Sequence, residues 1–280
     1  MIVVGVDGSE AGRAAVEWAA DEAGRTGEPV RLVHAVDRWP YQVSRYPAPE
    51  LADWLTRGGE EILARAEEIA RARQPHVEVA TALAEGPVAL TLRDQAKDAS
   101  AIVVGSRGLG GFAGALLGSV SIHVAGQAHC PVVVVHADQG PVKGLIVVGV
   151  DDSPECEPAL EYAFGQASML GARVLAVHGW QLPTGLGSPE LYFDMDEIRT
   201  ARHQVVADRL AAMAEKFPQV EVAEMVRNAH PVDLLVQASA EADLVVVGSH
   251  GRGAVRSALL GSVSRGVLHH ARCAVAVVRS

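Results

Sequence analysis

The chain contains few aromatic residues, few cysteines and little clustered positive charge. Only 4% of its 280 residues are aromatic, although 49% are hydrophobic, mostly Val, Ala and Leu. Small aliphatic side chains suit helices packed closely on a parallel sheet. The three cysteines, Cys130, Cys156 and Cys273, are too few and too widely spaced for a disulfide framework or a metal cluster. We therefore interpret Cys130 and Cys273, which lie 143 residues apart before Val-rich runs, as small buried side chains.

The charge balance and the lack of long apolar runs exclude two classes of partner. The formal net charge is −10 at pH 7, and no run of Lys or Arg opposes it locally. Such a charge repels polyanions, so nucleic acid is not expected as a partner. No apolar run approaches the roughly 18 to 20 residues needed to cross a bilayer, so no membrane association is expected either. No secretory leader is visible ahead of the apolar stretch Ile2–Val6, and we expect a cytoplasmic protein.

What the chain does contain is an internal duplication. The heptapeptide Ala-Leu-Leu-Gly-Ser-Val-Ser occupies residues 115–121 and occurs again, letter for letter, at residues 258–264. Each copy ends a glycine pattern, Gly-x2-Gly-x9-Gly-Ser, which begins at Gly105 in the first half and at Gly248 in the second. The two patterns are 143 residues apart, which is close to half of the 280-residue chain.

Other residues repeat with nearly the same spacing. Asp7 and Asp151 lie 144 residues apart, and each follows a short Val-rich run. We therefore predict two domains of one kind, residues 1–137 and 144–280. The stretch 137–144, which holds two glycines and a proline, is the expected linker.

Strand-like and helix-like segments alternate within each half. Helices are expected after Ser9 and Ser153, from Pro87 and Pro231, and from Ser119 and Ser262. The expected strands are Ile2–Val6, Val30–Val36, Val77–Leu83, Ile102–Val104 and Val132–Val135 in the first half, and Ile146–Val150, Val174–Trp180, Val220–Val226, Leu244–Val247 and Ala274–Val278 in the second. This alternation predicts the α/β class, with two tandem, doubly wound, Rossmann-like sheets of five parallel strands in the order 3-2-1-4-5. The ligand of such a sheet lies beyond the carboxyl ends of strands one and four.

The segments 38–60 and 181–200 are the least alike between the halves, and they are rich in Pro, Tyr, Trp and Gly. They are either lids or contact surfaces over the crevice, or ordinary surface connections.

The glycine pattern favours phosphate binding after strand four. Glycine leaves main-chain N–H groups accessible and permits positive φ angles. Gly118 and Ser119 would open a helix whose unpaired N–H groups face an anion. Hydroxyl donors at the two helix starts would come from Ser119, Ser121, Ser262 and Ser264. The alternative is a glycine-rich turn with ordinary capping serines. The pattern lacks the lysine of the Walker loop, and it follows strand four, whereas the dinucleotide fingerprint follows strand one.

Side chains around this crevice differ between the halves. Arg107 would offset phosphate charge in the first site, whereas His250 takes its place in the second, with Arg252 nearby. The two sites are therefore expected to differ in affinity or pH response. Asp7 and Asp151 either accept a hydrogen bond from an adenine amino group or ribose hydroxyl, or bond the backbone of their own turns.

Two histidines, His34 and His178, also repeat at 144 residues. Neither has carboxylate or cysteine partners at the spacing of metal ligands. We therefore interpret both as packed or hydrogen-bonded side chains, and no metal ligands are predicted.

Over nearly its whole length the sequence resembles the universal stress protein family in its tandem form. The resemblance is carried by Val-Val-Gly-Ser-Arg-Gly at residues 103–108, by Gly-Ser-Val-Ser at residues 118–121, and by the second copy of this motif. The motif is typical of the ATP-binding subgroup of that family. The resemblance implies that the main chain of Ala35 and Gly179 contacts adenine and that the glycine patterns hold ribose and phosphates.

The complete set of expected nucleotide-binding residues is Asp7, Gly8, Ser9, Ala35, Gly105, Arg107, Gly108, Gly118, Ser119, Val120 and Ser121 in the first half, and Asp151, Asp152, Ser153, Gly179, Gly248, His250, Gly251, Gly261, Ser262, Val263 and Ser264 in the second. The family commonly dimerises through its fifth strand. This implies pairing of residues 132–135 with residues 274–278 within the chain, and it allows a homodimer. Three departures between the halves put the equivalence of the two sites in doubt: Gly86 against His230, Ser100 against Asp243, and Pro131 against Ala274.

We expect an ATP-binding stress-response regulator with one nucleotide site per half, acting through nucleotide-dependent conformation or partner binding. Its protein partners are not indicated. Mg²⁺ beside the phosphates is a further expectation, although no carboxylate pair marks a site for it. One alternative is a slow ATP hydrolase or phosphotransferase, but no repeated residue supplies a base at the terminal phosphate, so no catalytic residue is predicted. The others are a ligand-free dimerising scaffold and, on architecture alone, an electron-carrying flavoprotein.

Overall fold

The structure is a computed structural model, and it describes residues 1–37, 49–109, 117–138, 140–153, 156–182, 194–251 and 260–279. Large parts of the two expected lids, residues 38–48 and 183–193, lie outside the described residues, as do Pro154 and Arg252. The chain divides into two compact units, Met1–Gly140 and Pro141–Ser280.

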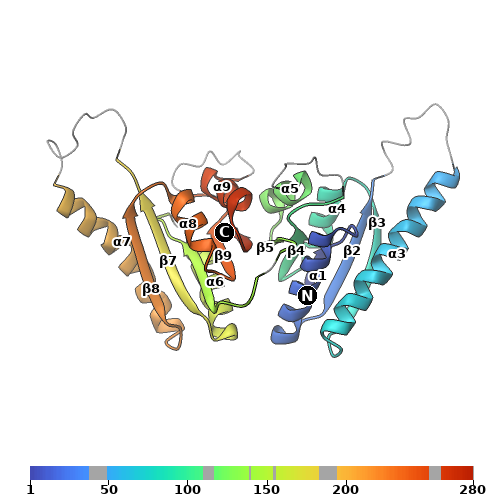
Figure 1. The fold of residues 1–280 in the computed structure, drawn as a ribbon, viewed down its shortest axis with the longest axis horizontal. Helices are drawn as coiled ribbons and strands as arrows, with labels where there is room; N and C mark the ends of the chain where they lie inside the picture. Colours follow the sequence, from blue (N-terminus) through green and yellow to red (C-terminus); the bar gives the residue numbers. More distant parts are fainter. Residues whose placement is uncertain are drawn as a thin grey trace. The chain divides into compact units, whose positions relative to one another are not determined.

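The first unit is a parallel sheet with helices on both faces. Its elements are β1 (Ile2–Gly5), α1 (Glu10–Thr26), β2 (Val30–Val36), α3 (Pro49–Arg73), β3 (Val79–Glu85), α4 (Val88–Gln95), β4 (Ala101–Gly105), α5 (Ser119–Gln127) and β5 (Val132–Val135). The strands lie in the order β3-β2-β1-β4-β5. Helices α1 and α3 pack against each other on one face, while α4 and α5 pack together on the other (Figure 1).

The second unit repeats this arrangement. Its elements are β6 (Leu145–Gly149), α6 (Cys156–Leu170), β7 (Arg173–Trp180), α7 (Met195–Lys216), β8 (Val222–Asn228), α8 (Pro231–Ser239), β9 (Leu244–Gly248), α9 (Ser262–His270) and β10 (Ala274–Val278). The strand order is β8-β7-β6-β9-β10. The predicted α/β class and the strand order 3-2-1-4-5 are therefore confirmed in both units.

The third strand of each unit lies two residues later than the sequence predicted. Val77 and Val220 close turns, because their N–H groups donate to the carbonyl oxygens of Gln74 and Phe217, at 3.1 Å in both cases. Strand β3 then pairs with the full length of β2, from Val79 to Glu85. Each third strand therefore begins only after this turn. Strand β3 ends where its pairing with β2 ends.

Helix α1 shows how small residues position the future site. The Ser9 hydroxyl accepts a hydrogen bond from the N–H of Gly12 at 3.1 Å and caps the helix. The helix ends at Gly27, whose φ of 70° is the left-handed conformation that glycine tolerates. Three alanines of this helix, Ala15, Ala19 and Ala23, are fully buried. Their short side chains let the helix lie close to β1 and β4.

The three cysteines are free and buried, as expected for Cys130 and Cys273. Burial raises the pKa of Cys130, raises that of Cys156 to about 11, and raises that of Cys273 to about 12. Thiols with such pKa values are protonated at neutral pH. Among the described helices, none has the length and apolar character that a membrane crossing requires.

Candidate functional site

A cavity of about 530 Å³ opens at the carboxyl ends of β1, β2 and β4 in the first unit. Of the residues predicted to bind nucleotide in this half, nine line it: Asp7, Ala35, Gly105, Arg107, Gly108, Gly118, Ser119, Val120 and Ser121. Gly8 and Ser9 lie beside it in the β1–α1 turn. The cavity lies at the switch point of the sheet, where doubly wound folds bind their ligands.

Part of the cavity wall is apolar, and the sequence reasoning did not find it. The wall includes Val33 from β2 and both Val88 and Leu92 from α4. Leu92 is almost fully buried and approaches the Gly5 backbone. The helical spacing of Val88 and Leu92 was the available signal, because residues four apart share one helix face. The cavity therefore combines an apolar wall with the polar main chain of the glycine loop.

The polar end of the cavity is the start of α5. Gly118 is the N-cap residue of this helix, and as a glycine it has no side chain with which to cap the helix. The first hydrogen bond within the helix runs from the N–H of Ile122 to the carbonyl oxygen of Gly118, at 3.3 Å. The N–H groups of residues 119–121 come before that bond, and these residues line the cavity. A helix start without a side-chain cap presents positive partial charge and free donors to whatever occupies the cavity.

Helix α9 repeats this uncapped start. Gly261 precedes the helix without a side-chain cap, and its carbonyl oxygen accepts from the N–H of Arg265 at 3.0 Å. In both units the main chain of this glycine is hydrogen-bonded to the residue that follows the fourth strand. The N–H of Gly118 donates to the carbonyl oxygen of Ser106 at 2.7 Å, and the N–H of Gly261 donates to that of Ser249 at 2.8 Å. From Gly118 and Gly261 onward, the sequence repeat is therefore also a repeat of backbone geometry.

The predicted residues of the second unit lie at the carboxyl ends of its strands. The β6–α6 turn contains Asp151, Asp152 and Ser153, and β7 contains Gly179. Strand β9 ends at Gly248, and His250 and Gly251 follow it. The start of α9 contains Gly261, Ser262, Val263 and Ser264. Gly179 differs from its counterpart Ala35, because a Cβ atom there would lie 2.7 Å from the Cα atom of Pro231. The start of α8 therefore packs directly on the backbone of β7.

The glycines of the pattern serve purposes other than positive φ, so that expectation was wrong. The described glycines with positive φ are Gly8, Gly27, Gly86, Gly144 and Gly171. A Cβ atom on Gly105 would lie 2.6 Å from the carbonyl carbon of Ala11. On Gly108 and Gly251 it would lie 2.5 and 2.4 Å from Oδ2 of Asp7 and Asp151. These glycines permit close packing of α1 and close approach of a carboxylate to the loop.

Two of the four predicted hydroxyl donors are committed to the fold, which corrects the role expected for them. Ser121 is buried and donates to the carbonyl oxygen of Gly105 at 2.7 Å. Ser264 is buried as well, and its hydroxyl lies 3.1 Å from the Ser249 carbonyl oxygen and 3.0 Å from that of Gly261. Ser119 and Ser262 are exposed and remain available to a ligand.

The two aspartates hold their own turns, as one of the two interpretations predicted. Asp7 Oδ1 accepts from the N–H of Ser9 at 3.0 Å and from its hydroxyl at 2.6 Å. Asp7 Oδ2 accepts from the N–H of Leu109 at 3.0 Å, so this carboxylate also ties the turn to the glycine loop. In the second unit Asp151 Oδ1 accepts from the N–H of Ser153 at 2.9 Å and from the Ser153 hydroxyl.

The repeated histidines are hydrogen-bonded, as predicted. Nδ1 of His34 lies 2.7 Å from the carbonyl oxygen of Val6, and Nδ1 of His178 lies 2.8 Å from that of Val150. Each histidine thus links the end of the second strand of its unit to the end of the first. Among the described residues, no group of three His, Cys, Asp or Glu side chains is arranged to hold a metal ion.

The charged side chains of the two loops differ. Arg107 is exposed at the cavity, and its carbonyl oxygen accepts from the Ser9 hydroxyl at 3.2 Å. His250 stands in its place, with Nδ1 3.1 Å from the Ser249 hydroxyl. Burial, and then the charge of Arg107, lowers the pKa of His136, which follows β5.

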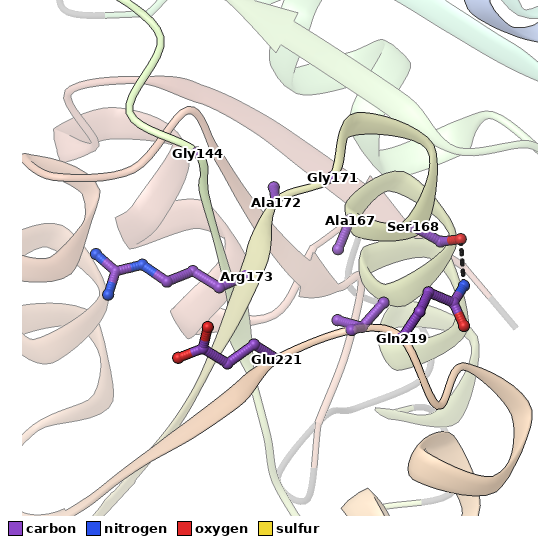
Figure 2. A pocket seen from close by; sticks show the side chains of 9 residues that line it. Gly144, Ala167, Ser168, Gly171, Ala172, Arg173, Gln219 and Glu221 are labelled. Atoms are coloured by element: carbon purple, nitrogen blue, oxygen red, sulfur yellow. Dashed lines mark hydrogen bonds between the residues drawn. The ribbon is translucent and has the colours of Figure 1, made fainter.

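A second, shallower cavity of about 300 Å³ lies at the amino ends of β6 and β7 (Figure 2). Ser168 and Gln219 join across one side through a 2.6 Å hydrogen bond, while Arg173 and Glu221 lie on the other side. Its lining contains none of the residues predicted to bind nucleotide. Because doubly wound sheets bind ligands at the opposite edge, we assign this cavity no part in the site.

The fold defines a tandem α/β protein of two doubly wound units, with a cavity at the switch point of the first sheet. The model of the Universal stress protein family matches residues 1–136 and 145–279, and the chain belongs to this family. A universal stress protein of Mycobacterium tuberculosis is 38% identical over 290 residues, covering 99% of this chain and 96% of that protein. One from Mycolicibacterium smegmatis is 37% identical over 287 residues, with coverage of 99% and 96%.

A solved structure shows the same fold. The crystal structure of a universal stress protein from Archaeoglobus fulgidus matches with a TM-score of 0.74 at 21% identity, covering 99% of this chain and 96% of that chain. The resemblance stated from the motifs is thus confirmed at the level of the family.

Proposed function

We propose that each unit binds an adenine nucleotide, ATP first of all, and that the chain acts in the stress response through nucleotide-dependent conformation or partner binding. The observation that carries the proposal is the uncapped start of α5 at the polar end of a 530 Å³ cavity. Free N–H groups at a helix start are a ready site for phosphate oxygens. The identical start of α9 extends the proposal to the second unit.

The rest of the cavity suits the nucleoside. The apolar side chains of Val33, Val88 and Leu92 offer a wall for a flat base, and the main chain of Ala35 lies along the same cavity. Asp7 lines the cavity and can accept from a ribose hydroxyl or an amino group once its bond to Leu109 is exchanged. Binding that exchanges this bond would couple the nucleotide to the glycine loop.

The same cavity argues against the alternative of an ATP hydrolase. Asp7 is the one acidic residue among its described lining, and both of its carboxylate oxygens already accept hydrogen bonds. A phosphoryl-transfer enzyme needs a group that orients the attacking water. For the same reason Mg²⁺ would be held chiefly by phosphate oxygens and water. We therefore favour a binding protein over an enzyme.

Location and assembly belong to the same proposal. We place the protein in the cytoplasm, where ATP is available and free thiols stay reduced. Its three cysteines are free and buried. A homodimer, which the family resemblance allows, stays a prediction that the molar mass in solution, measured by light scattering, would test.

A matched pair of variants at Ser119 tests the phosphate contact. Ser119→Pro removes one N–H group, and the fold tolerates it, because proline suits the first residue of a helix and Gly118 has the extended ψ of 150° that proline requires before it. Ser119→Ala removes the hydroxyl alone. By titration calorimetry with ATP, we expect Ser119→Pro to weaken the first site about tenfold or more, equal to about 1.4 kcal/mol.

We expect a smaller loss in Ser119→Ala, which separates the amide from the hydroxyl. Ser262→Pro repeats the test in the second unit, where Gly261 has a ψ of 160°. Mass spectrometry of small molecules released from denatured protein identifies the native ligand. If wild-type protein carries no adenine nucleotide and gives no heat with ATP, the ligand-free scaffold replaces the binder. If Ser119→Pro binds ATP as tightly as wild type, the proposed phosphate contact is wrong.

A further inference from the structure

The turn that carries the aspartate is built differently in the two units. In the first unit Gly8 follows Asp7 and has a φ of 82°, a left-handed conformation. In the second unit Asp152 takes the place of Gly8, and no described residue other than glycine has positive φ. A side chain makes the left-handed conformation costly, so the second turn needs another means of holding its shape.

Arg209 of α7 holds the second turn, because its side chain reaches the main chain of that turn. Its Nη2 atom donates to the carbonyl oxygen of Asp152 at 3.2 Å and to that of Ser153 at 3.1 Å, in a partly buried position. The equivalent residue of the first unit is Ala66 on α3, 143 positions earlier, which is buried and cannot donate. The first unit thus has glycine in the turn and alanine on the helix. The second unit has aspartate in the turn and arginine on the helix.

The shape of this turn sets the position of Asp151. The N–H of Ser153 donates to Asp151 Oδ1 at 2.9 Å, so the carboxylate moves with the turn. Its other oxygen lies close over the glycine loop, where a Cβ atom on Gly251 would be 2.4 Å away. A displaced turn would therefore shift the carboxylate against the loop that leads to α9.

We propose that Arg209 is a positioning residue of the second nucleotide site, which it serves by clamping the main chain of Asp152 and Ser153 and thereby fixing Asp151. The inference rests on the proposed function, since it assigns a role at a nucleotide site. It makes the two sites separable, because the first unit has Ala66 where the second has Arg209.

The test uses the full chain and titration calorimetry with ATP. Arg209→Ala is expected to weaken the second site about tenfold and to leave the first site unchanged. Adding Asp152→Gly to Arg209→Ala is expected to recover most of that loss, because glycine restores the turn that Gly8 gives the first unit. Arg199→Ala is the matched control: Arg199 lies on the same helix and forms only an exposed 3.1 Å ion pair with Asp196.

Hydrogen exchange supplies a readout that does not depend on nucleotide. Arg209→Ala should speed amide exchange in peptides spanning residues 151–160, and peptides spanning residues 7–16 should exchange as in wild type. Unchanged exchange, or wild-type affinity at both sites, overturns the inference. Loss of affinity that Asp152→Gly does not rescue also overturns it, since Arg209 would then act on the nucleotide directly. If Arg209→Ala speeds exchange but the wild-type chain binds no ATP, the proposed function is wrong. The clamp then has no role at a nucleotide site.

Discussion

At the scale of single residues, the glycines of one motif have different neighbours. A Cβ atom on Gly105 would lie 2.6 Å from the carbonyl carbon of Ala11 and 2.7 Å from the nitrogen of Gly12. These are main-chain atoms, which cannot move aside as the end of a flexible side chain could. A Cβ atom on Gly118 would lie 3.4 Å from the Ser106 carbonyl oxygen, an ordinary contact. The sequence pattern treats both positions alike, yet the first is required for packing.

We therefore predict that Gly105→Ala lowers the free energy of unfolding of the first unit by about 1 to 3 kcal/mol, because the added methyl pushes α1 away from β4. Urea denaturation followed by circular dichroism measures the change. Gly140→Ala is the control, because a Cβ atom at Gly140 would meet nothing within 4 Å. Equal midpoints for the two variants would contradict the proposed packing role.

At the scale of elements, a charged contact joins α1 to the end of α3. Asp21 accepts from Arg73 at 2.8 and 2.7 Å, and from the Gln74 amide at 3.2 Å. Burial alone would raise the pKa of Asp21, but the hydrogen bonds from Arg73 and Gln74 outweigh it and hold the pKa below its ordinary value. The ionised carboxylate of Asp21 therefore stabilises the folded protein.

The sign of the pH dependence follows from that direction. A carboxyl group with a lowered pKa in the folded state contributes stability above its unfolded pKa of about 3.9 and loses it as the pH falls through the folded pKa. We predict that Asp21→Asn lowers stability by up to about 1 kcal/mol at pH 7, because the contact is partly exposed, and has a smaller effect near pH 3. Urea midpoints at the two pH values measure this, with exposed Asp98→Asn as control. An equal loss at both pH values would exclude the ionised contact.

Another element-scale difference explains a departure between the halves. Asp243 accepts from the N–H groups of Lys143, Gly144 and Leu145 at 2.8, 2.7 and 3.2 Å, and so fixes the entry into β6. Ser100, its counterpart, donates to the Met1 carbonyl oxygen at 3.0 Å. The difference between Ser100 and Asp243 thus concerns the strand entry at the amino edge and not the proposed nucleotide sites.

At the scale of the whole molecule, each unit is expected to respond to its own ligand. A ligand at a free concentration of 100 times its Kd stabilises the unit that binds it by about 2.7 kcal/mol. We predict that ATP at this concentration raises the unfolding temperature of both units, and that Ser119→Pro reduces the rise for the first unit only, because a tenfold weaker site leaves about 1.4 kcal/mol of that stabilisation. Differential scanning calorimetry with and without ATP checks this. A rise confined to one unit in the wild type would mean that only one site binds ATP.

Much of the candidate site followed from the sequence, and the rest depended on packing. The glycine repeat predicted the loop after strand four and the start of α5, because glycine and N-cap signals are local. The apolar wall formed by Val33, Val88 and Leu92 was missed, since these residues meet only when α4 packs over β2. The role of Ser121 was also missed, because its acceptor, the Gly105 carbonyl oxygen, is sixteen residues away.

By itself, the sequence determined the duplication, the α/β class, the strand order and the edge of the sheet where the cavity of the first unit lies. These follow from the repeat, from apolar periodicity and from right-handed crossovers, which act over short stretches of chain. Only the tertiary structure decided which glycines make room for backbone or carboxylate, which serine hydroxyls are bonded to main-chain carbonyl oxygens, and that Arg209 holds the β6–α6 turn. Such roles depend on distances between residues far apart in the chain, and those distances are set by how the helices pack on the sheet.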